Sequence, residues 1–167
     1  ITNVMEEYTP ELDQMLFYLP LSGSTFKKVY YDASLGRAVS KFIPAEDLVV
    51  PYTATDLESC ERITHVVRMS ENEVRKKQVS GFYRDIDLKT YDDSQQNSYA
   101  VKDKIDRLEG VEQVGEGMMM SLLEFHVNLD LVGYEDKQGE EKTGIKIPYI
   151  VTIDEESRNV LSIRRNF

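Results

Sequence analysis

The sequence has a single cysteine and no long apolar run, and each of these absences excludes a class of protein. Cys60 alone cannot build an internal disulfide framework, and a zinc site would need other residue types as ligands. No apolar stretch approaches the roughly 20 residues that cross a bilayer, and the first residues lack the basic and apolar regions of a signal peptide. We therefore expect no membrane insertion and a reducing, cytosolic origin.

Basic charge is also scarce. Twenty Lys and Arg stand against 30 Asp and Glu, which gives a net charge of −10. Proteins that grip duplex DNA neutralise several phosphates with clustered Lys and Arg, so this balance argues against tight DNA binding. It is compatible with a surface past which DNA slides, because a wall that repels phosphates offers few places to bind.

The sequence also lacks a glycine-rich phosphate loop of the Walker or dinucleotide type, so nucleotide binding has no support. We expect no catalytic residue, no cofactor and no metal site, and thus not an enzyme.

What is present is the composition of a folded domain. The 167 residues are 41% hydrophobic and 30% charged, which is too apolar for a chain that stays disordered and sufficient for one domain, alone or with a satellite. The sequence begins at Ile1 rather than at a methionine and ends at Phe167 directly after an expected strand. We therefore expect a segment of a longer protein.

The N-terminal part predicts a helix followed by a hairpin. Thr9 can cap a helix whose first turn holds Pro10, and Pro20 should end it. Segments 26–31 and 37–43 are rich in aromatic and β-branched residues and flank a turn, which predicts a β-hairpin. A short strand should follow at 48–50.

The next elements are a strand and a capped helix. Along 62–69 apolar residues alternate with others and include His65 on the apolar face, which predicts a half-buried strand. Ser70 precedes Glu73 by the spacing of a capping box, so a helix should cover 71–79 with Val74 and Val79 on its buried face.

The C-terminal part predicts an antiparallel β-meander. The expected strands are 123–131, 145–153 and 160–165, with a charged hairpin tip at 135–142, and Pro148 suggests an edge strand or a bulge. A further helix is expected at 99–108. The predicted fold class is α+β, dominated by strands, with an α+β region over 1–110 and a β-rich region over 111–167 that is separate or part of the same domain.

Several residue groups could carry chemistry, and each has a plainer structural interpretation. Cys60 with His65 suggests a thiolate and a base, but we favour a packed core histidine and an incidental cysteine. His126 beside Glu124 could share a metal, although an exposed or interface histidine is favoured. The acidic runs Asp92-Asp93 and Asp154-Glu155-Glu156 could bind calcium, yet they lack EF-hand spacing and fit solvated turns better.

Three further groups of residues also allow both a functional and a structural interpretation. Met118-Met119-Met120 could form an adaptable interface, but a strand entrance packed on the core is favoured. Lys27-Lys28 and Arg75-Lys76-Lys77 could contact phosphates, while a solvated face is the favoured interpretation. Carboxylates near Tyr149 and Asp154 are the only basis for an enzyme hypothesis.

One stretch matches a known pattern in order as well as composition. It runs from Phe26-Lys27-Lys28-Val29-Tyr30-Tyr31-Asp32 through Gly36-Arg37-Ala38-Val39 to Ile43-Pro44-Ala45-Glu46-Asp47-Leu48-Val49-Val50-Pro51-Tyr52, then to Asp56-Leu57-Glu58, Arg62-Ile63-Thr64-His65-Val66 and the capped helix. This resembles the wing region of the portal proteins of short-tailed, double-stranded DNA phages and prophages. The resemblance covers about the middle third of the chain, Phe26 to Tyr83. The meander from Leu122 to Arg165 looks like the β-rich part near the clip and stem of such portals.

The resemblance implies a structural role. Such head-to-tail connectors form a homo-oligomeric ring, usually of twelve subunits, at one capsid vertex of the virion, after assembly in the bacterial host cytoplasm. The ring serves capsid assembly, genome packaging with the terminase, and attachment of the tail adaptor, and double-stranded DNA passes through it without sequence-specific binding. The sequence contains no long amphipathic helix like the family's stem helices, so the channel would be formed largely by other parts of the protein. Another phage assembly module, such as a tail or adaptor protein, is the alternative.

Overall fold

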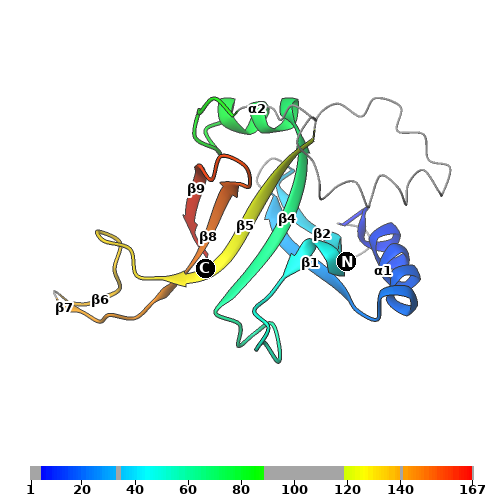
Figure 1. The fold of residues 1–167 in the computed structure, drawn as a ribbon, viewed down its shortest axis with the longest axis horizontal. Helices are drawn as coiled ribbons and strands as arrows, with labels where there is room; N and C mark the ends of the chain where they lie inside the picture. Colours follow the sequence, from blue (N-terminus) through cyan, green and yellow to red (C-terminus); the bar gives the residue numbers. More distant parts are fainter. Residues whose placement is uncertain (1–4, 33–34, 89–118, 140, 167) are drawn as a thin grey trace. The chain divides into compact units, whose positions relative to one another are not determined.

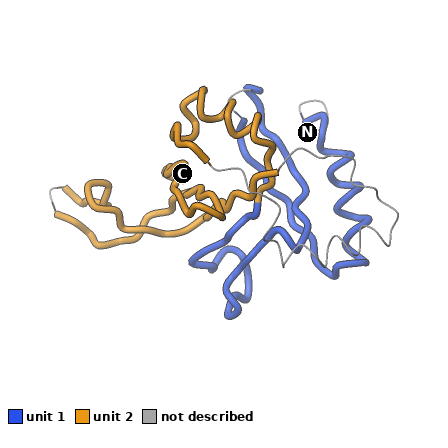
Figure 2. The backbone as a smooth tube through the Cα atoms, turned by 45° about the horizontal axis from the view of Figure 1, so that its top comes forward, with its two compact units in different colours: residues 1–66 blue, residues 67–167 orange. Residues whose placement is uncertain are grey.

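The computed structural model describes residues 5–32, 35–88, 119–139 and 141–166. It divides into two compact units, residues 1–66 and 67–167, shown in different colours in Figure 2. The boundary falls within a strand that contributes residues to both units. The domain boundary expected near residue 110 lies outside the described residues and stays a prediction, as does the expected helix at 99–108.

Unit 1 contains one helix and a two-stranded antiparallel hairpin (Figure 1). Its elements are α1 (Tyr8–Ser22), β1 (Thr25–Asp32), β2 (Arg37–Pro44), the 3-10 turn η1 (Ala45–Asp47) and β3 (Leu48–Val49). The hairpin pairs in register from Thr25 with Pro44 to Asp32 with Arg37. The hairpin predicted over 26–43 is therefore confirmed to within one residue at each end.

Helix α1 differs from the expectation at both of its ends. The helix begins two residues earlier, where the Glu11 amide donates to the Glu7 carbonyl, so Glu7 rather than Thr9 is the N-cap residue. The helix also continues through Pro20, because a proline there removes only the single bond to the carbonyl four residues before it. Gly23, with φ of 76°, ends the helix and donates its amide to the Leu19 carbonyl at 2.9 Å.

Strand β3 and four later strands form a five-stranded sheet in the order β3-β4-β5-β8-β9, and β6 and β7 form a separate two-stranded sheet. The elements that follow β3 are β4 (Arg62–Ser70), α2 (Glu71–Val79), β5 (Met119–Leu129), the short β6 (Lys137–Gln138) and β7 (Glu141–Lys142), β8 (Ile147–Asp154) and β9 (Val160–Arg165). Strands β5, β8 and β9 are antiparallel neighbours. The expected fold class, a strand-dominated α+β fold with a hairpin, short helices and an antiparallel meander, is confirmed.

The pairing of β5 with β8 builds a separate apolar cluster on each face of the sheet. Leu123 lies opposite Ile153, Phe125 opposite Val151 and Val127 opposite Tyr149, so these side chains share one face. This first cluster contains Ile147, Tyr149 and Val151 with Phe125, Val127, Leu129, Leu131, Ile153 and Val160 around them. The second cluster, on the other face, joins Met120 and Leu122 to Val74, Tyr83 and Leu161.

A β-bulge in β9 lets this strand contribute to both clusters. The register shifts between Thr152 and Ile153, so Val160 pairs with Ile153 while Ser162 pairs with Thr152. Leu161 is the extra residue and is fully buried in the second cluster, next to Ser162, which is also buried. Two consecutive side chains therefore enter the same face, which strict alternation does not allow.

Pro148 lies in an inner strand, so the expected edge position was wrong. The Asn166 amide donates to the Pro148 carbonyl at 2.9 Å, which shows that this side of Pro148 faces the end of β9. Since β9 ends at Arg165, the missing donor of the proline removes a bond only at the margin of the sheet.

Helix α2 matches its predicted bounds, and the predicted capping box is present. The Ser70 hydroxyl accepts from the Glu73 amide at 3.3 Å, and the Glu73 carboxylate accepts from the Ser70 amide at 3.1 Å. Val79, expected on the buried face, is 76% exposed, and Gln78 is buried instead. Gln78 tolerates this position because its amide group donates to the carbonyls of Ile86 at 2.7 Å and of Arg84 at 3.3 Å.

None of the helices in the described part of the chain is long and apolar enough to cross a membrane.

We predict that Leu161→Ala destabilises unit 2 by about 2–5 kcal/mol, because it empties a fully buried position beside Leu122 and Val74. Urea denaturation followed by circular dichroism measures the change. The control is Ile163→Ala on the same strand, where the side chain is 49% exposed and the loss should stay below about 1 kcal/mol. Equal losses for the two variants would contradict the bulged placement of Leu161.

Candidate assembly surface

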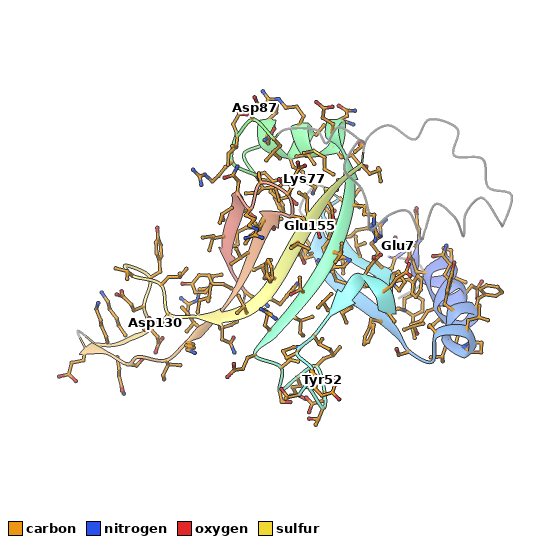
Figure 3. The ribbon with its side chains drawn as sticks, in the orientation of Figure 1. Glu7, Tyr52, Lys77, Asp87, Asp130 and Glu155 are labelled. Atoms are coloured by element: carbon orange, nitrogen blue, oxygen red, sulfur yellow. The ribbon has the colours of Figure 1, made fainter. Side chains whose placement is uncertain are left out.

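Helix α1 is attached to the hairpin by carboxylates that accept from backbone amides of β2. The Glu7 carboxylate binds the Arg37 guanidinium at 2.6 Å and accepts from the Ser40 amide at 3.3 Å. The Glu11 carboxylate accepts from the Phe42 amide. The two carboxylates are one helical turn apart and meet alternate amides of the strand, since these amides point the same way along its edge. Figure 3 shows Glu7 at the start of α1.

This attachment leaves most of the apolar surface of α1 exposed. No residue of the helix is buried, and its main apolar contact is the stacking of Tyr18 on Phe42 at 5.5 Å between ring centroids. Leu16, Phe17 and Leu21 are 54, 68 and 72% exposed. Exposed apolar groups of this size mark surfaces that contact other molecules.

A second projecting element, in unit 2, also carries exposed apolar side chains. Beyond the sheet, β5 and β8 continue into an arm, residues 130–146, that ends in the short pair β6–β7 (Figure 1). Val132, Tyr134 and Ile145 in this arm are 93, 73 and 58% exposed. The charged tip predicted at 135–142 lies at its end.

The arm is held in shape by polar contacts rather than by a hydrophobic core. The Glu135 carboxylate binds the Lys142 ammonium at 2.6 Å, which lowers the pKa of Glu135 and raises that of Lys142. The Asp136 carboxylate accepts from the Thr143 hydroxyl at 2.7 Å, and the Tyr149 hydroxyl donates to the Tyr134 carbonyl at 3.2 Å. The arm therefore presents its apolar side chains from a defined backbone.

A row of buried and partly buried polar side chains lies on the face of the second cluster, and sequence patterns did not predict it. Glu124, Thr152 and Ser162 occupy paired positions on β5, β8 and β9, and the Ser162 hydroxyl lies 3.2 Å from that of Thr152. Burial, with the nearby charge of Glu124, raises the pKa of Tyr83 to about 12. Tyr83 therefore stays protonated at neutral pH. The sequence feature that could have indicated this row is the presence of Ser and Thr at strand positions that face the core.

His126 lies on the polar face of β5, as predicted, and its Nε2 is 2.8 Å from the Glu124 carboxylate. Both side chains are only partly exposed. Among the described residues, no group of three or more His, Cys, Asp or Glu side chains could hold a metal ion. The pair is a polar contact within the sheet.

Asp154 is buried, unlike the solvated turn expected for its acidic run. Its carboxylate accepts from the Ser157 hydroxyl at 2.6 Å and from the Ser157 amide at 2.8 Å, and it thereby closes the turn between β8 and β9. Tyr149 is five positions earlier on the same strand and faces the first cluster, so the two residues point to opposite faces. The structure does not bring together the residues of the enzyme hypothesis.

The other predicted groups fall in separate places. His65 is buried and Cys60 is partly exposed in the preceding turn. Thr64, expected on the exposed face of β4, is buried too. Met120 is in the core and Met119 is 53% exposed. Asp92, Asp93 and Met118 lie outside the described residues.

The side chains of each basic cluster contact different partners. Lys27 lies over the ring of Tyr8 at 4.1 Å and Lys28 over that of Tyr30 at 5.5 Å. In α2, Arg75 pairs with Asp85 on the surface, while Lys77 lies over the Phe82 ring at 4.6 Å. In neither cluster do these contacts leave a single patch of adjacent cations.

Comparison of the sequence with models of known protein families gave no match. Comparison with curated proteins gave no significant match either.

We predict that Glu7→Gln loosens α1 at neutral pH. Arg37 holds the pKa of Glu7 below its ordinary 4.5, so the ionised contact is present above pH 4.5 and is lost as the pH falls below that value. Hydrogen exchange of the Ser40 and Phe42 amides should be faster in the variant at pH 7, and the wild type should approach it in acid. Asp13→Asn, on an exposed position of the same helix, is the control. Unchanged exchange in Glu7→Gln would show that the carboxylate does not hold the helix.

We also predict that the stability of unit 2 falls between about pH 10 and about pH 12. The pKa of Tyr83 is raised above its ordinary 10.0, so its contribution is complete below pH 10 and is lost as the pH rises through the folded value. Thermal midpoints across this range should show a smaller decrease in Tyr83→Phe than in wild type. Tyr52→Phe, which alters a fully exposed ring, should retain the wild-type dependence. Identical profiles for all three chains would refute the assignment.

Proposed function

We propose that this chain is a structural segment of a phage portal ring, the connector at one capsid vertex that acts in genome packaging, capsid assembly and tail attachment. In this role it contributes no active site. Its partners are further copies of the same subunit, the terminase, and the capsid and tail adaptor proteins, with double-stranded DNA passing through the ring.

The observation that carries the proposal is the exposure of apolar side chains on two projecting elements. Helix α1 presents five large apolar residues, and the arm three, that the described parts of the chain do not bury. Such elements cost solubility in a chain that works alone, and they are typical of subunits that bury them against neighbours. This favours an assembly subunit over an enzyme or a monomeric binding domain.

The order of elements in the resembling stretch supports the portal among assembly proteins. The hairpin β1–β2 is followed by η1 and the short strand β3, then by an irregular acidic turn, β4 and the capped helix α2. The tyrosines Tyr30 and Tyr31 lie at the far end of β1, and Leu48-Val49 pair with Thr64 and His65. The elements therefore follow one another in the order that the resemblance implies.

The alternative is another phage assembly module, such as an adaptor or a tail protein. The exposed apolar residues fit it equally well, because they indicate assembly and not a particular ring. The neighbours of the parent gene discriminate between the two, since a portal gene lies beside terminase and scaffold or capsid genes.

The test is the assembly state of the full-length parent protein. Electron microscopy should show rings with a central channel, and their absence would overturn the portal assignment. Val132→Asp in the arm and Phe17→Asp in α1 place a charge on the exposed apolar groups and should each reduce the fraction of assembled subunits about tenfold or more. Lys137→Glu, on an exposed polar position of the arm, is the matched control and should assemble normally.

A further inference from the structure

The outer edge of β9 has an open stretch of backbone. Strand β9 is the last strand of the sheet, so only one of its edges is paired. The Asn166 amide points to β8, and the Leu161 carbonyl points away from β8, where it accepts from the Arg84 amide at 2.8 Å. By alternation, the amide and carbonyl of Ile163 point away from β8 as well. Within the part of the chain that the structure describes, they have no partner on that side.

Cations gather beside this open edge, in a chain whose net charge is −10. The Arg164 guanidinium lies over the Phe82 ring at 3.6 Å, and the Lys77 ammonium lies over the same ring at 4.6 Å. Arg84 reaches the start of β9, where its guanidinium is 3.5 Å from the Val160 carbonyl. Figure 3 labels Lys77, which α2 contributes.

These charges are not neutralised inside the described chain. Lys77, Arg84 and Arg164 form no ion pair among the described residues, whereas Arg75, on the same helix as Lys77, is paired with Asp85. Phe82 keeps 39% of its surface exposed between the two cations that flank it. The group therefore offers positive charge and an aromatic surface directly beside unpaired backbone donors and acceptors.

We propose that the edge of β9, with Lys77, Arg84 and Arg164, binds an extended acidic segment of a partner protein, which pairs with β9 as an additional strand. Main-chain hydrogen bonds to Ile163 give the affinity, and the cations select for carboxylates. This site is independent of the proposed portal role, because it uses no residue of α1 and none of the exposed apolar residues of the arm.

The two faces of β9 define the pattern of the segment. Arg164 lies on the face of the second cluster, with Phe82, and Ile163 lies on the opposite face, where it is 49% exposed. A strand paired with β9 places successive side chains on alternate faces. The segment therefore alternates acidic residues, which meet Arg164, with apolar residues, which cover Ile163.

A nucleic acid fits this surface less well than a peptide. Phosphates satisfy the cations, but a sugar–phosphate chain cannot pair with both the amide and the carbonyl of Ile163. An exposed Ile side chain beside those groups also favours a partner with apolar side chains. The combination of backbone edge, apolar residue and cations thus identifies a polypeptide.

The experiment uses the full chain and a labelled, terminally blocked nine-residue peptide of alternating Glu and Val. Three probes are compared with it: the Lys and Val counterpart, the acidic peptide with a central proline, and a single-stranded DNA oligonucleotide. Fluorescence anisotropy gives the affinities, and hydrogen exchange reports on the Ile163 amide. The acidic peptide should bind about tenfold or more tightly than either other peptide and should protect this amide.

Two variants separate the backbone from the charges. Ile163→Pro removes only an outward amide, which an edge strand tolerates, and should weaken binding about tenfold or more. Arg164→Glu should do the same through charge, while the control Lys146→Glu, an exposed position elsewhere in unit 2, should change affinity less than about twofold. Circular dichroism checks that each variant is folded.

Three results would overturn the proposal. The first is DNA that binds as tightly as the acidic peptide without protecting the Ile163 amide, which would make the surface a phosphate site. The second is an Ile163 amide already protected in the free chain, which would mean that the edge is covered. The third is equal binding of the acidic and basic peptides.

Discussion

The antiparallel pairing of β5 with β8 is the constraint on which the rest of unit 2 depends. Its register decides, residue by residue, which side chains enter the cluster around Tyr149 and which enter the cluster around Leu122. A shift of this register by one residue would exchange the two sets of side chains and place Glu124 and His126 in the cluster around Tyr149. The bulge at Leu161 and the packing of α2 and Tyr83 both require the face that this register creates.

Unit 1 is organised by a different kind of force. Its helix is attached by carboxylates that accept from strand amides and by one stacked aromatic pair, and no residue of the helix is buried. Hydrogen bonds to charged groups are stronger than neutral ones, yet exposed ion pairs contribute little to stability. The apolar residues of α1 are therefore left for contacts outside the unit, which is the basis of the proposed assembly role.

Local signals were sufficient wherever the determinant is short in sequence. The Ser70–Glu73 box specified the start of α2, and alternation specified β5 and β8, because both patterns depend only on residues a few positions apart. The failures depend on contacts that helical or alternating patterns do not describe. Gln78 replaces Val79 on the buried face because carbonyls of the following loop satisfy it, Asp154 is buried because Ser157 donates to it twice, and Pro148 is tolerated in an inner strand because β9 ends beside it. The row formed by Glu124, Thr152 and Ser162 comes from three separate strands, so no single pattern predicts it. Of the candidate site, the position of His126 beside Glu124 on one face of β5 followed from the sequence, whereas their direct contact did not, since an exposed or interface histidine was favoured. The exposure of α1 did not follow either, because apolar residues at helical spacing are also typical of a buried helix.

The contacts of Glu7 and Glu11 have a practical consequence for handling this chain. By accepting from the amides of Ser40 and Phe42, these carboxylates occupy donors that would otherwise lie open along β2. A chain shortened past Glu11 would expose this row of donors beside the aromatic residues of the hairpin, which is a template for edge-to-edge aggregation. Helix α1 therefore also covers a strand edge of the hairpin, and a shortened version intended for expression should begin before Glu7.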